Sequence, residues 1–308
     1  FKFSVCSYVV SLLRPQIIRE LDLRRHGLEV LPLDGTFTPM PDGNYLWRTD
    51  DHDRTRQELE RHSRRDAAVY DDYGRALVDM ARFVKPTLDE RPPDPFSLRL
   101  RDLAGLTRLG RRFQALPADA RERFIQLMTM SAAEFLDRWF ETDVLKATLS
   151  ASGIIGTFLG VRSPGTAYVL LHHYMGEIDG VFRSWGLARG GTGAISNAIA
   201  AAAREAGVEI RTSAAVGRIR TARGRATGVV LDNGDEIEAS IVSSSVDPRL
   251  TFLRLLDPRE LPDDFAGEVR RIKYRGSSAK VNLALDARPE FACLPGDGPH
   301  LRGAISIS

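Results

Sequence analysis

Three glycines, at positions 190, 191 and 193, have a spacing that resembles a cofactor-binding loop. The run at 189–196 reads RGGTGAIS and opens an alanine-rich stretch with helical periodicity. In a dinucleotide fingerprint such a loop follows a buried strand, and the amide groups at the helix start bind a pyrophosphate. Residues 182–188 show no clear apolar strand, and Ser196 stands at the third glycine position. Three interpretations stay open: a nucleotide loop, a tight structural turn, and a helix start that faces another ligand.

A pair of adjacent histidines, His172 and His173, is followed by Tyr174 and is the second chemical signal. Adjacent side chains point in different directions on a helix or a strand, and no HExxH motif accompanies the pair, so the sequence predicts no metal site. One histidine is suited to carry a proton near neutral pH, although a hydrogen-bonded core histidine is the more frequent role. The chain has no GxSxG motif, and neither Cys6 nor Cys293 lies in a thiolate signature, so nucleophilic catalysis is not indicated.

The composition is that of an ordinary globular protein. The chain has 308 residues, 43 basic and 41 acidic, with a formal net charge of +2 and 43% hydrophobic residues. A near-neutral balance gives no reason to expect nucleic acid as a partner, and no apolar stretch approaches the roughly 20 residues of a membrane span. Two cysteines without a CxxC pair indicate a reduced compartment, the cytoplasm or, in a eukaryote, the mitochondrial matrix. Because the sequence starts at Phe1 and ends on a strand-like run at 304–308, we expect an internal fragment of a longer protein.

The first half of the chain has mainly helical patterns. A long helix is expected over 57–83, after an acidic start at 50–53 that suits a positive helix end better than a metal site. A capping box at 131–134 predicts another helix start. The segments 28–33 and 44–48 flank an Asp-Gly turn, and we interpret them as a short hairpin.

The second half changes to a helix followed by short strands. The apolar face of 192–206 and the glycine after it predict a helix with a C-terminal cap. Strand-like runs follow at 208–220, 226–231 and 235–242, the last two joined by an Asn-Gly turn. We therefore expect an antiparallel meander, and a further strand at 281–285.

The residues from 163 to 255 carry a family resemblance. The segments LLHH at 170–173, GGTGA at 190–194 and GVVLDNGDEIEAS at 228–240 resemble flavin-dependent oxidoreductases of the phytoene desaturase and amine oxidase superfamily. The resemblance covers most of the chain and is strongest over these roughly ninety residues.

The resemblance implies an α/β fold, with an α+β substrate part, in which an FAD-binding domain and a substrate domain are interleaved. Residues 1–185 would form the mostly helical substrate domain, with its hairpin. Residues 186–248 would be the middle segment of the FAD domain, a helix plus an antiparallel meander, and 249–308 would return to the substrate domain. The GxGxxG unit and the carboxyl-terminal FAD segment of the family have no counterpart here, so we expect this fragment to bind FAD poorly by itself.

The resemblance also implies site residues. Val216 matches the position whose backbone reads the adenine of FAD, and Gly190 and Gly191 match a loop beside the flavin. Ser245 stands where the family commonly has asparagine, which weakens its assignment to the cofactor. The segment His172–Tyr174 is our candidate for the wall of the substrate cavity.

The implied activity is hydride transfer from a substrate C–H bond to FAD, with a small apolar or amphipathic substrate. An alternative is a non-catalytic scaffold that retains the oxidoreductase fold as an interaction platform. A third possibility is a dehydrogenase that binds NAD directly at the glycine loop.

Overall fold

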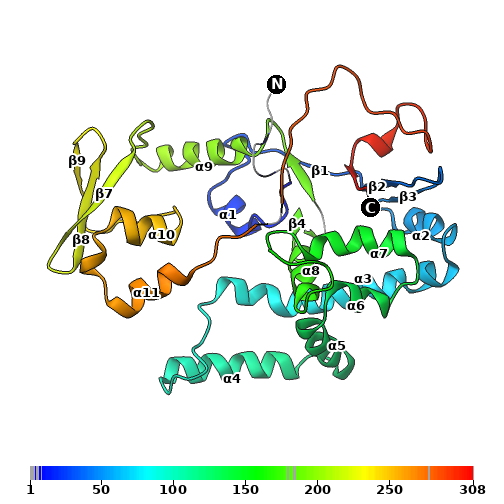
Figure 1. Ribbon diagram of the computed structural model, residues 1–308, viewed down its shortest axis with the longest axis horizontal. Coiled ribbons are helices and arrows are strands. Elements are labelled where there is room, and N and C mark those ends of the chain that lie inside the picture. Colours follow the sequence, from blue (N-terminus) through cyan, green and yellow to red (C-terminus); the bar gives the residue numbers. More distant parts are fainter. Residues whose placement is uncertain are drawn as a thin grey trace. The chain divides into compact units, whose positions relative to one another are not determined.

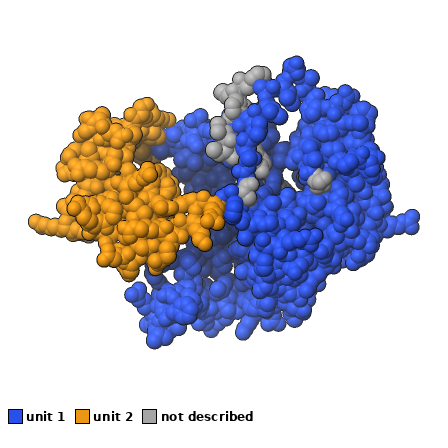
Figure 2. Space-filling model, in the orientation of Figure 1, with its two compact units in different colours: residues 1–203, 276–308 blue, residues 204–275 orange. Residues whose placement is uncertain are grey.

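The computed structural model describes residues 4, 7, 9–178, 180–182, 185–276 and 278–307. Phe1, Cys6 and Ser308, on which sequence-based expectations touched, lie outside these residues. The chain divides into two compact units, residues 1–203 with 276–308 and residues 204–275 (Figure 2).

A cluster of helices forms the core of the first unit (Figure 1). Tyr73 is completely buried there, and its ring centroid lies 4.9 Å from that of Phe140 and 6.2 Å from that of Tyr174. The helices that contribute to this core are α2 (His52–Glu60), α3 (Arg64–Val84), α5 (Ala118–Thr129), α6 (Ala132–Asp137), α7 (Asp143–Ser150) and α8 (Thr166–Tyr174). Two further helices of the first unit are α4 (Leu100–Gln114) and the short 3₁₀ helix η1 (Lys85–Asp89). The first unit also contains α1 (Pro15–Glu20), η2 (Ala151–Gly153) and η5 (Pro299–Leu301).

The helix expected over 57–83 is two helices, because a cap interrupts it. The Ser63 hydroxyl accepts a hydrogen bond from the Asp66 N–H at 3.1 Å and starts α3 after the end of α2. The capping box predicted at Ser131 and Glu134 is present at the start of α6.

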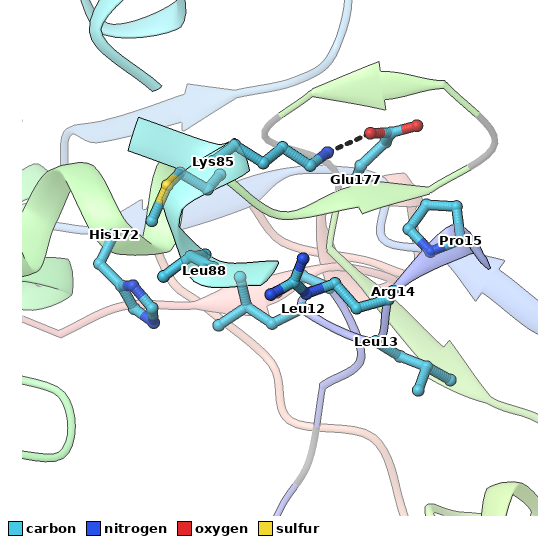
Figure 3. Close-up of a pocket in the computed structure, with 10 residues that line it drawn as sticks. Leu12, Leu13, Arg14, Pro15, Lys85, Leu88, His172 and Glu177 are labelled. Atoms are coloured by element: carbon cyan, nitrogen blue, oxygen red, sulfur yellow. Dashed lines mark hydrogen bonds and ion pairs between the residues drawn. The ribbon is translucent and has the colours of Figure 1, made fainter. Parts of the chain in front are cut away.

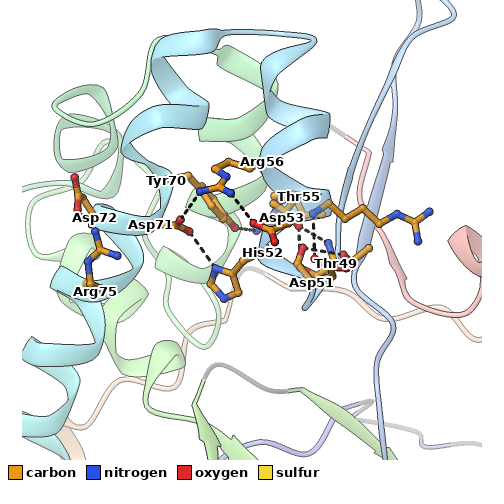
Figure 4. Close-up of polar contacts among 12 residues, drawn as sticks. Thr49, Asp51, His52, Asp53, Thr55, Arg56, Tyr70, Asp71, Asp72 and Arg75 are labelled. Atoms are coloured by element: carbon orange, nitrogen blue, oxygen red, sulfur yellow. Dashed lines mark hydrogen bonds and ion pairs between the residues drawn. The ribbon is translucent and has the colours of Figure 1, made fainter.

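The acidic residues before α2 act as a helix cap, as the sequence predicted. The Asp51 carboxylate accepts a hydrogen bond from the Arg54 N–H at 3.1 Å (Figure 4). The Asp71 carboxylate of α3 forms hydrogen bonds with His52 Nδ1 at 3.1 Å and with Arg56 Nη1 at 3.4 Å. Because both partners belong to α2, these contacts connect α2 to α3. These are exposed or partly exposed polar contacts, so they orient the two helices more than they stabilise them.

Small sheets complete the first unit. β1 (Val30–Pro32) pairs antiparallel with β6 (Gly186–Ala188), and β4 (Glu177–Ile178) pairs with β5 (Val181–Phe182). β2 (Thr36–Pro39) and β3 (Tyr45–Arg48) form a hairpin, and β10 (Ala304–Ile305) adds to β2 in parallel. The hairpin turn lies where the Asp-Gly signal predicted it, with Gly43 at φ 81°. Its first strand is 36–39 and not 28–33, because residues 30–32 pair with a strand far along the sequence.

The helix α9 (Gly193–Glu205) leads from the first unit into the second, and Gly207 follows it at φ 85°. The second unit contains the three-stranded antiparallel sheet β7 (Val216–Ala222), β8 (Arg225–Leu231) and β9 (Glu236–Glu238), in that order. Short helices follow: α10 (Pro248–Leu250), η3 (Thr251–Leu255), η4 (Pro258–Glu260) and α11 (Asp263–Arg271). The predicted meander is therefore present, although its first strand begins at 216 and not at 208.

The strand expected at 281–285 is absent from the described structure. Val281 and Leu283 are 76% and 75% exposed, and no described strand lies beside them to supply backbone hydrogen bonds. The prediction of a strand here is wrong, because a strand requires a neighbour with which to form backbone hydrogen bonds.

The fold is a mixture of helices and small sheets, in agreement with the coarse α/β and α+β expectation. The second compact unit spans residues 204–275. The expected middle segment of the FAD domain runs over 186–248. That domain assignment stays a prediction. None of the helices in the described ranges is long and apolar enough to cross a membrane.

Candidate functional site

The glycine loop at 190–193 connects β6 to α9. A short strand, β6, stands before the loop, so the expectation of no strand there is wrong. The strand is held by tertiary contacts that no local pattern shows: a Cβ on Gly186 would lie 2.7 Å from Val30 Cγ1. It pairs antiparallel with β1, which differs from the parallel sheet of a dinucleotide fold.

Gly190 and Gly191 have φ angles of 84° and 85°, a left-handed conformation that favours glycine. A Cβ added to Gly190 would meet no described heavy atom within 4 Å. The backbone conformation, and not crowding, therefore requires glycine at this position. Gly190 is exposed, and Gly191 is half-buried.

A lysine far along the sequence is linked to this loop through the amino-terminal segment. The Thr192 N–H, next to the start of α9, donates a hydrogen bond to Ser4 Oγ at 3.0 Å. Lys280 Nζ donates to the carbonyl oxygens of Ser4 at 2.6 Å and Ser7 at 3.1 Å. The Lys280 ammonium group, Ser4 and the start of α9 therefore lie together. Sequence reasoning missed Lys280, which is one of only five lysines in the chain but lies in no recognisable motif.

Arg189 anchors the other end of the loop. Its Nη2 donates to Glu29 Oε1 at 2.9 Å, its Nε donates to the second carboxylate oxygen, and its N–H donates to the Glu29 carbonyl oxygen at 2.9 Å. The hydrogen bond from the guanidinium lowers the pKa of the Glu29 carboxyl. Both side chains are more than half exposed, so this pair orients the loop and adds little stability.

A cavity of about 270 Å³ lies between the segment at 11–15, η1 and the end of α8 (Figure 3). Its lining combines apolar walls with four ionisable side chains. The apolar residues are Leu12, Leu13, Pro15, Leu88 and Met175, and the ionisable ones are Arg14, Lys85, His172 and Glu177. Such a lining suits a ligand with an apolar body and a polar end.

His172 is the one of the three histidine-segment candidates that lines this cavity. Burial lowers the pKa of His172, and the neighbouring His173 lowers it further, so the ring is neutral near pH 7. His173 instead donates from Nδ1 to the Val169 carbonyl oxygen at 2.9 Å. Tyr174 is 6% exposed in the core, with its hydroxyl 3.1 Å from that of Tyr73. The assignment of His172, His173 and Tyr174 to the wall of a substrate cavity stays a prediction.

Two ion pairs border the cavity, and sequence reasoning did not find them. Lys85 Nζ contacts a carboxylate oxygen of Glu177, and both side chains are about four-fifths buried (Figure 3). Arg14 contacts Asp89 of η1. These partners lie far apart in the sequence, so no spacing rule could pair them. The rarity of lysine in an arginine-rich chain was the one available signal at position 85.

Val216 begins β7 at the edge of the three-stranded sheet and is 38% exposed. It lies opposite Leu231, but the Leu231 N–H donates to the Asp235 carbonyl oxygen at 2.8 Å. The next cross-strand bond runs from the Asp232 N–H to the Ala215 carbonyl oxygen at 2.9 Å. Val216 and Leu231 therefore form a non-hydrogen-bonded pair, in which the N–H and C=O of Val216 point to the outer edge. Among the described strands, only β8 pairs with β7, so this outer edge carries no strand.

A β-bulge follows Val216 and bends the edge. The register moves between Val216 and Arg218, and a Cβ on Gly217 would lie 2.7 Å from Asp232 Oδ1. Bulges of this kind redirect a strand end and commonly occur beside binding sites.

Ser245 is exposed in the segment between β9 and α10. The hydrogen bonds recorded here belong to its neighbours: Ser244 Oγ lies 2.7 Å from Thr251 Oγ1, and the Asp247 carboxylate caps α10. The structure thus brings Gly190, Gly191 and His172 into the first unit, whereas Val216 and Ser245 belong to the second. Within the ranges that the structure describes, no group of three or more His, Cys, Asp or Glu is arranged to hold a metal ion.

Comparison with known proteins decides the family. The model of a family described as flavin-containing amine oxidoreductases matches residues 33–306. The chain belongs to this family. The recognition of the phytoene desaturase and amine oxidase superfamily from the sequence is confirmed, and so is its FAD cofactor at the level of the family.

Two curated relatives share the name pyridine nucleotide-disulfide oxidoreductase domain-containing protein 2. The proteins of Rattus norvegicus and Mus musculus are each 35% identical to this chain, over 327 and 326 residues. Each match covers 100% of this chain and 56% of the relative, so the chain spans about half the length of these proteins. The LLHH and GGTGA segments predict this branch of the superfamily, and the matches confirm it.

A zeta-carotene-forming phytoene desaturase of Myxococcus xanthus is 34% identical over 104 residues, covering 33% of this chain and 20% of that protein. Among solved structures, a triple mutant of putrescine oxidase redesigned for cofactor binding has a TM-score of 0.45 and 16% identity. That match covers 85% of this chain and 50% of the other.

Taken separately within each unit, the residues that the resemblance assigns to FAD have a suitable chemistry. Val216 offers an exposed apolar side chain and outward backbone groups, which together suit the face and edge of an adenine ring. Gly190 leaves open space where a side chain would otherwise lie. The residues that bind the pyrophosphate in the family have no match in this sequence.

Proposed function

We propose that this chain is part of an FAD-dependent oxidoreductase that removes a hydride from a substrate C–H bond. The observation that carries the proposal is the family match over residues 33–306. Because the chain spans 56% of its curated relatives, we assign the complete activity to a longer protein. In this proposal residues 186–248 belong to the FAD domain, and 1–185 with 249–308 belong to the substrate domain.

FAD, when bound, supplies the acceptor for the hydride. The chain's own residues would provide binding and orientation. The outward N–H and C=O of Val216 would hold the adenine edge. In the first unit, the lack of side chains at Gly190 and Gly191 would let the cofactor approach the backbone closely. Lys280, linked to this loop through Ser4, would place a positive charge nearby.

The cavity beside His172 supports a small apolar or amphipathic substrate. Leucine and methionine side chains would exclude water from the apolar part, and the ionisable side chains would bind a polar end. His172, neutral because burial lowers its pKa, would be free to accept a proton from a substrate group.

The test compares two substitutions at one position. In the longer protein reconstituted with FAD, we expect Val216→Ala to retain bound flavin, because it keeps the backbone N–H. Val216→Pro lacks that N–H, and proline is tolerated at the first residue of an edge strand, so we expect flavin loss without unfolding. Flavin absorbance of the purified protein and circular dichroism measure these two outcomes.

Colourless wild-type protein after reconstitution would reject the flavoenzyme. Unchanged flavin in Val216→Pro would reject the adenine contact alone. Loss of a protein partner in that variant, with flavin unaffected, would favour the scaffold alternative, and NADH binding by this chain unaided would favour the NAD-binding one. The compartment, cytoplasm or mitochondrial matrix, is proposed from cysteine usage alone.

A further inference from the structure

Three apolar side chains at the tip formed by the start of α4 and the loop before it are almost fully exposed. Phe96, Leu98 and Leu100 are 94%, 89% and 86% exposed, and Leu103 of α4 is 41% exposed. The tip is the loop at the left end of α4 in Figure 1. Side chains of this size are usually buried, and a group of them on one exposed element marks an interaction surface.

Internal contacts hold the tip in shape. The Phe96 N–H donates to Asp94 Oδ1 at 2.9 Å, and the Asp94 N–H approaches Asp102 Oδ1 at 3.5 Å. Pro93 packs against α4 so closely that a Cβ on Gly105 would lie 3.0 Å from Pro93 Cβ. The apolar side chains are therefore held outward by a defined loop.

The far end of α4 attaches the tip to the helical core. Phe113 packs against Phe83 and Phe124, with ring centroids 5.8 and 6.0 Å away. The carboxyl end of α4 is thus packed within the first unit, whereas much of the helix is exposed.

The same element is strongly basic. Residues 91–112 contain six arginines and two aspartates, a formal net charge of +4, whereas the whole chain carries +2. Asp102 is 7% exposed, and the Asp94 carboxylate accepts a hydrogen bond from the tip backbone. The exposed arginines at 99, 101, 108 and 111 have no carboxylate at ion-pair distance among the residues that the structure describes.

We propose that the tip at 94–101 and the outer face of α4 bind an anionic lipid surface. The run FSLRLR at 96–101 places two arginines among three apolar residues, so positive charge lies directly beside the apolar side chains in the sequence. Phe96, Leu98 and Leu100 enter the headgroup region, and the arginines bind lipid phosphates. A protruding tip fits a fluid interface, whereas a protein partner would need a matching apolar groove with an acidic rim. This contact lies on the surface and crosses no bilayer.

The experiment measures sedimentation of the full chain with phosphatidylcholine vesicles containing about one third phosphatidylglycerol. We expect binding that weakens with salt and is lost on pure phosphatidylcholine. Phe96→Ser/Leu98→Ser should weaken binding at least about tenfold, and Arg99→Gln/Arg101→Gln should reduce it by a similar factor. The matched control is Ile241→Ser/Ile307→Ser, which changes two side chains that are 83% and 82% exposed elsewhere.

A second variant reports insertion directly. Phe96→Trp keeps an aromatic side chain at the tip, and its emission should shift to the blue and be quenched by brominated lipids. Absence of wild-type binding, no blue shift, or equal losses in the control would overturn the proposal. So would a dimer in sedimentation velocity that Phe96→Ser/Leu98→Ser dissociates, because the tip would then bind a second copy. The same variants in a longer protein test occlusion: if they have no effect there, another part of the protein covers the tip and the proposal fails.

Discussion

The ion pair between Lys85 and Glu177 should link two distant parts of the cavity wall energetically. The partners lie 92 residues apart, on η1 and β4, with side chains 22% and 19% exposed. Two unit charges about 4 Å apart at an effective dielectric constant of about 20 attract by about 4 kcal/mol. The cost of removing both from water offsets much of this, and the remaining exposure screens more, so we expect a coupling energy of about 2 kcal/mol.

The perturbation is a double-mutant cycle with Lys85→Met, Glu177→Gln and the double variant. Each single substitution should lower the free energy of unfolding by about 2–3 kcal/mol, because it removes the attraction between two largely buried charges. The double variant should lose about 2 kcal/mol less than the sum of the two.

Urea unfolding at neutral pH measures the cycle, with unchanged m-values as the check for two-state behaviour. The exposed pair Arg75–Asp72, with side chains 70% and 61% exposed, is the control, and its cycle should show little coupling. A Lys85–Glu177 coupling indistinguishable from that of the control would refute the reasoning, since the pair would then behave as solvated charges.

Three further predictions concern stability. Gly186→Ala places a Cβ 2.8 Å from the Leu31 carbonyl oxygen, a backbone atom. We expect it to lower the free energy of unfolding by about 1–3 kcal/mol in thermal melts. Unchanged stability would contradict the β1–β6 contact. Asp66→Ala leaves unpaired two backbone N–H groups, which its carboxylate binds at 3.0 and 2.9 Å, and should cost about 3 kcal/mol in urea, whereas a loss below about 1 kcal/mol would contradict a buried role. The folded-state pKa of His172 is below its unfolded value of about 6.5. The stability that this histidine contributes is therefore present above that pH and is lost as the pH falls toward the folded pKa. His172→Gln should flatten the acid side of the profile of unfolding free energy against pH, and an unchanged profile would contradict the lowered pKa.

Several local elements were predictable from the sequence because the interactions that form them lie within a few residues. The capping box of Ser131 and Glu134, the end of α9 at Gly207, and the turn between β8 and β9 all depend on contacts inside one turn. The family was predictable for a related reason: the LLHH and GGTGA segments are contiguous, so their identity is visible without any tertiary information.

The site depends on pairings that only the tertiary structure determines. Sequence patterns could not pair 30–32 with 186–188, bring Lys280 to Ser4, or place Glu177 beside Lys85. The strand expected at 281–285 shows the same limit, because an alternating pattern states which side chains share a face and says nothing about a neighbouring strand.

Residue types and their local spacing thus determined several helix ends, the turns and the family of this protein. Folding decided which backbone edges stay open, which charges are buried together, and that His172 lines a cavity while Tyr174 belongs to the core. The physical reason is that burial and long-range hydrogen bonding are properties of surroundings, which residues distant in the sequence create.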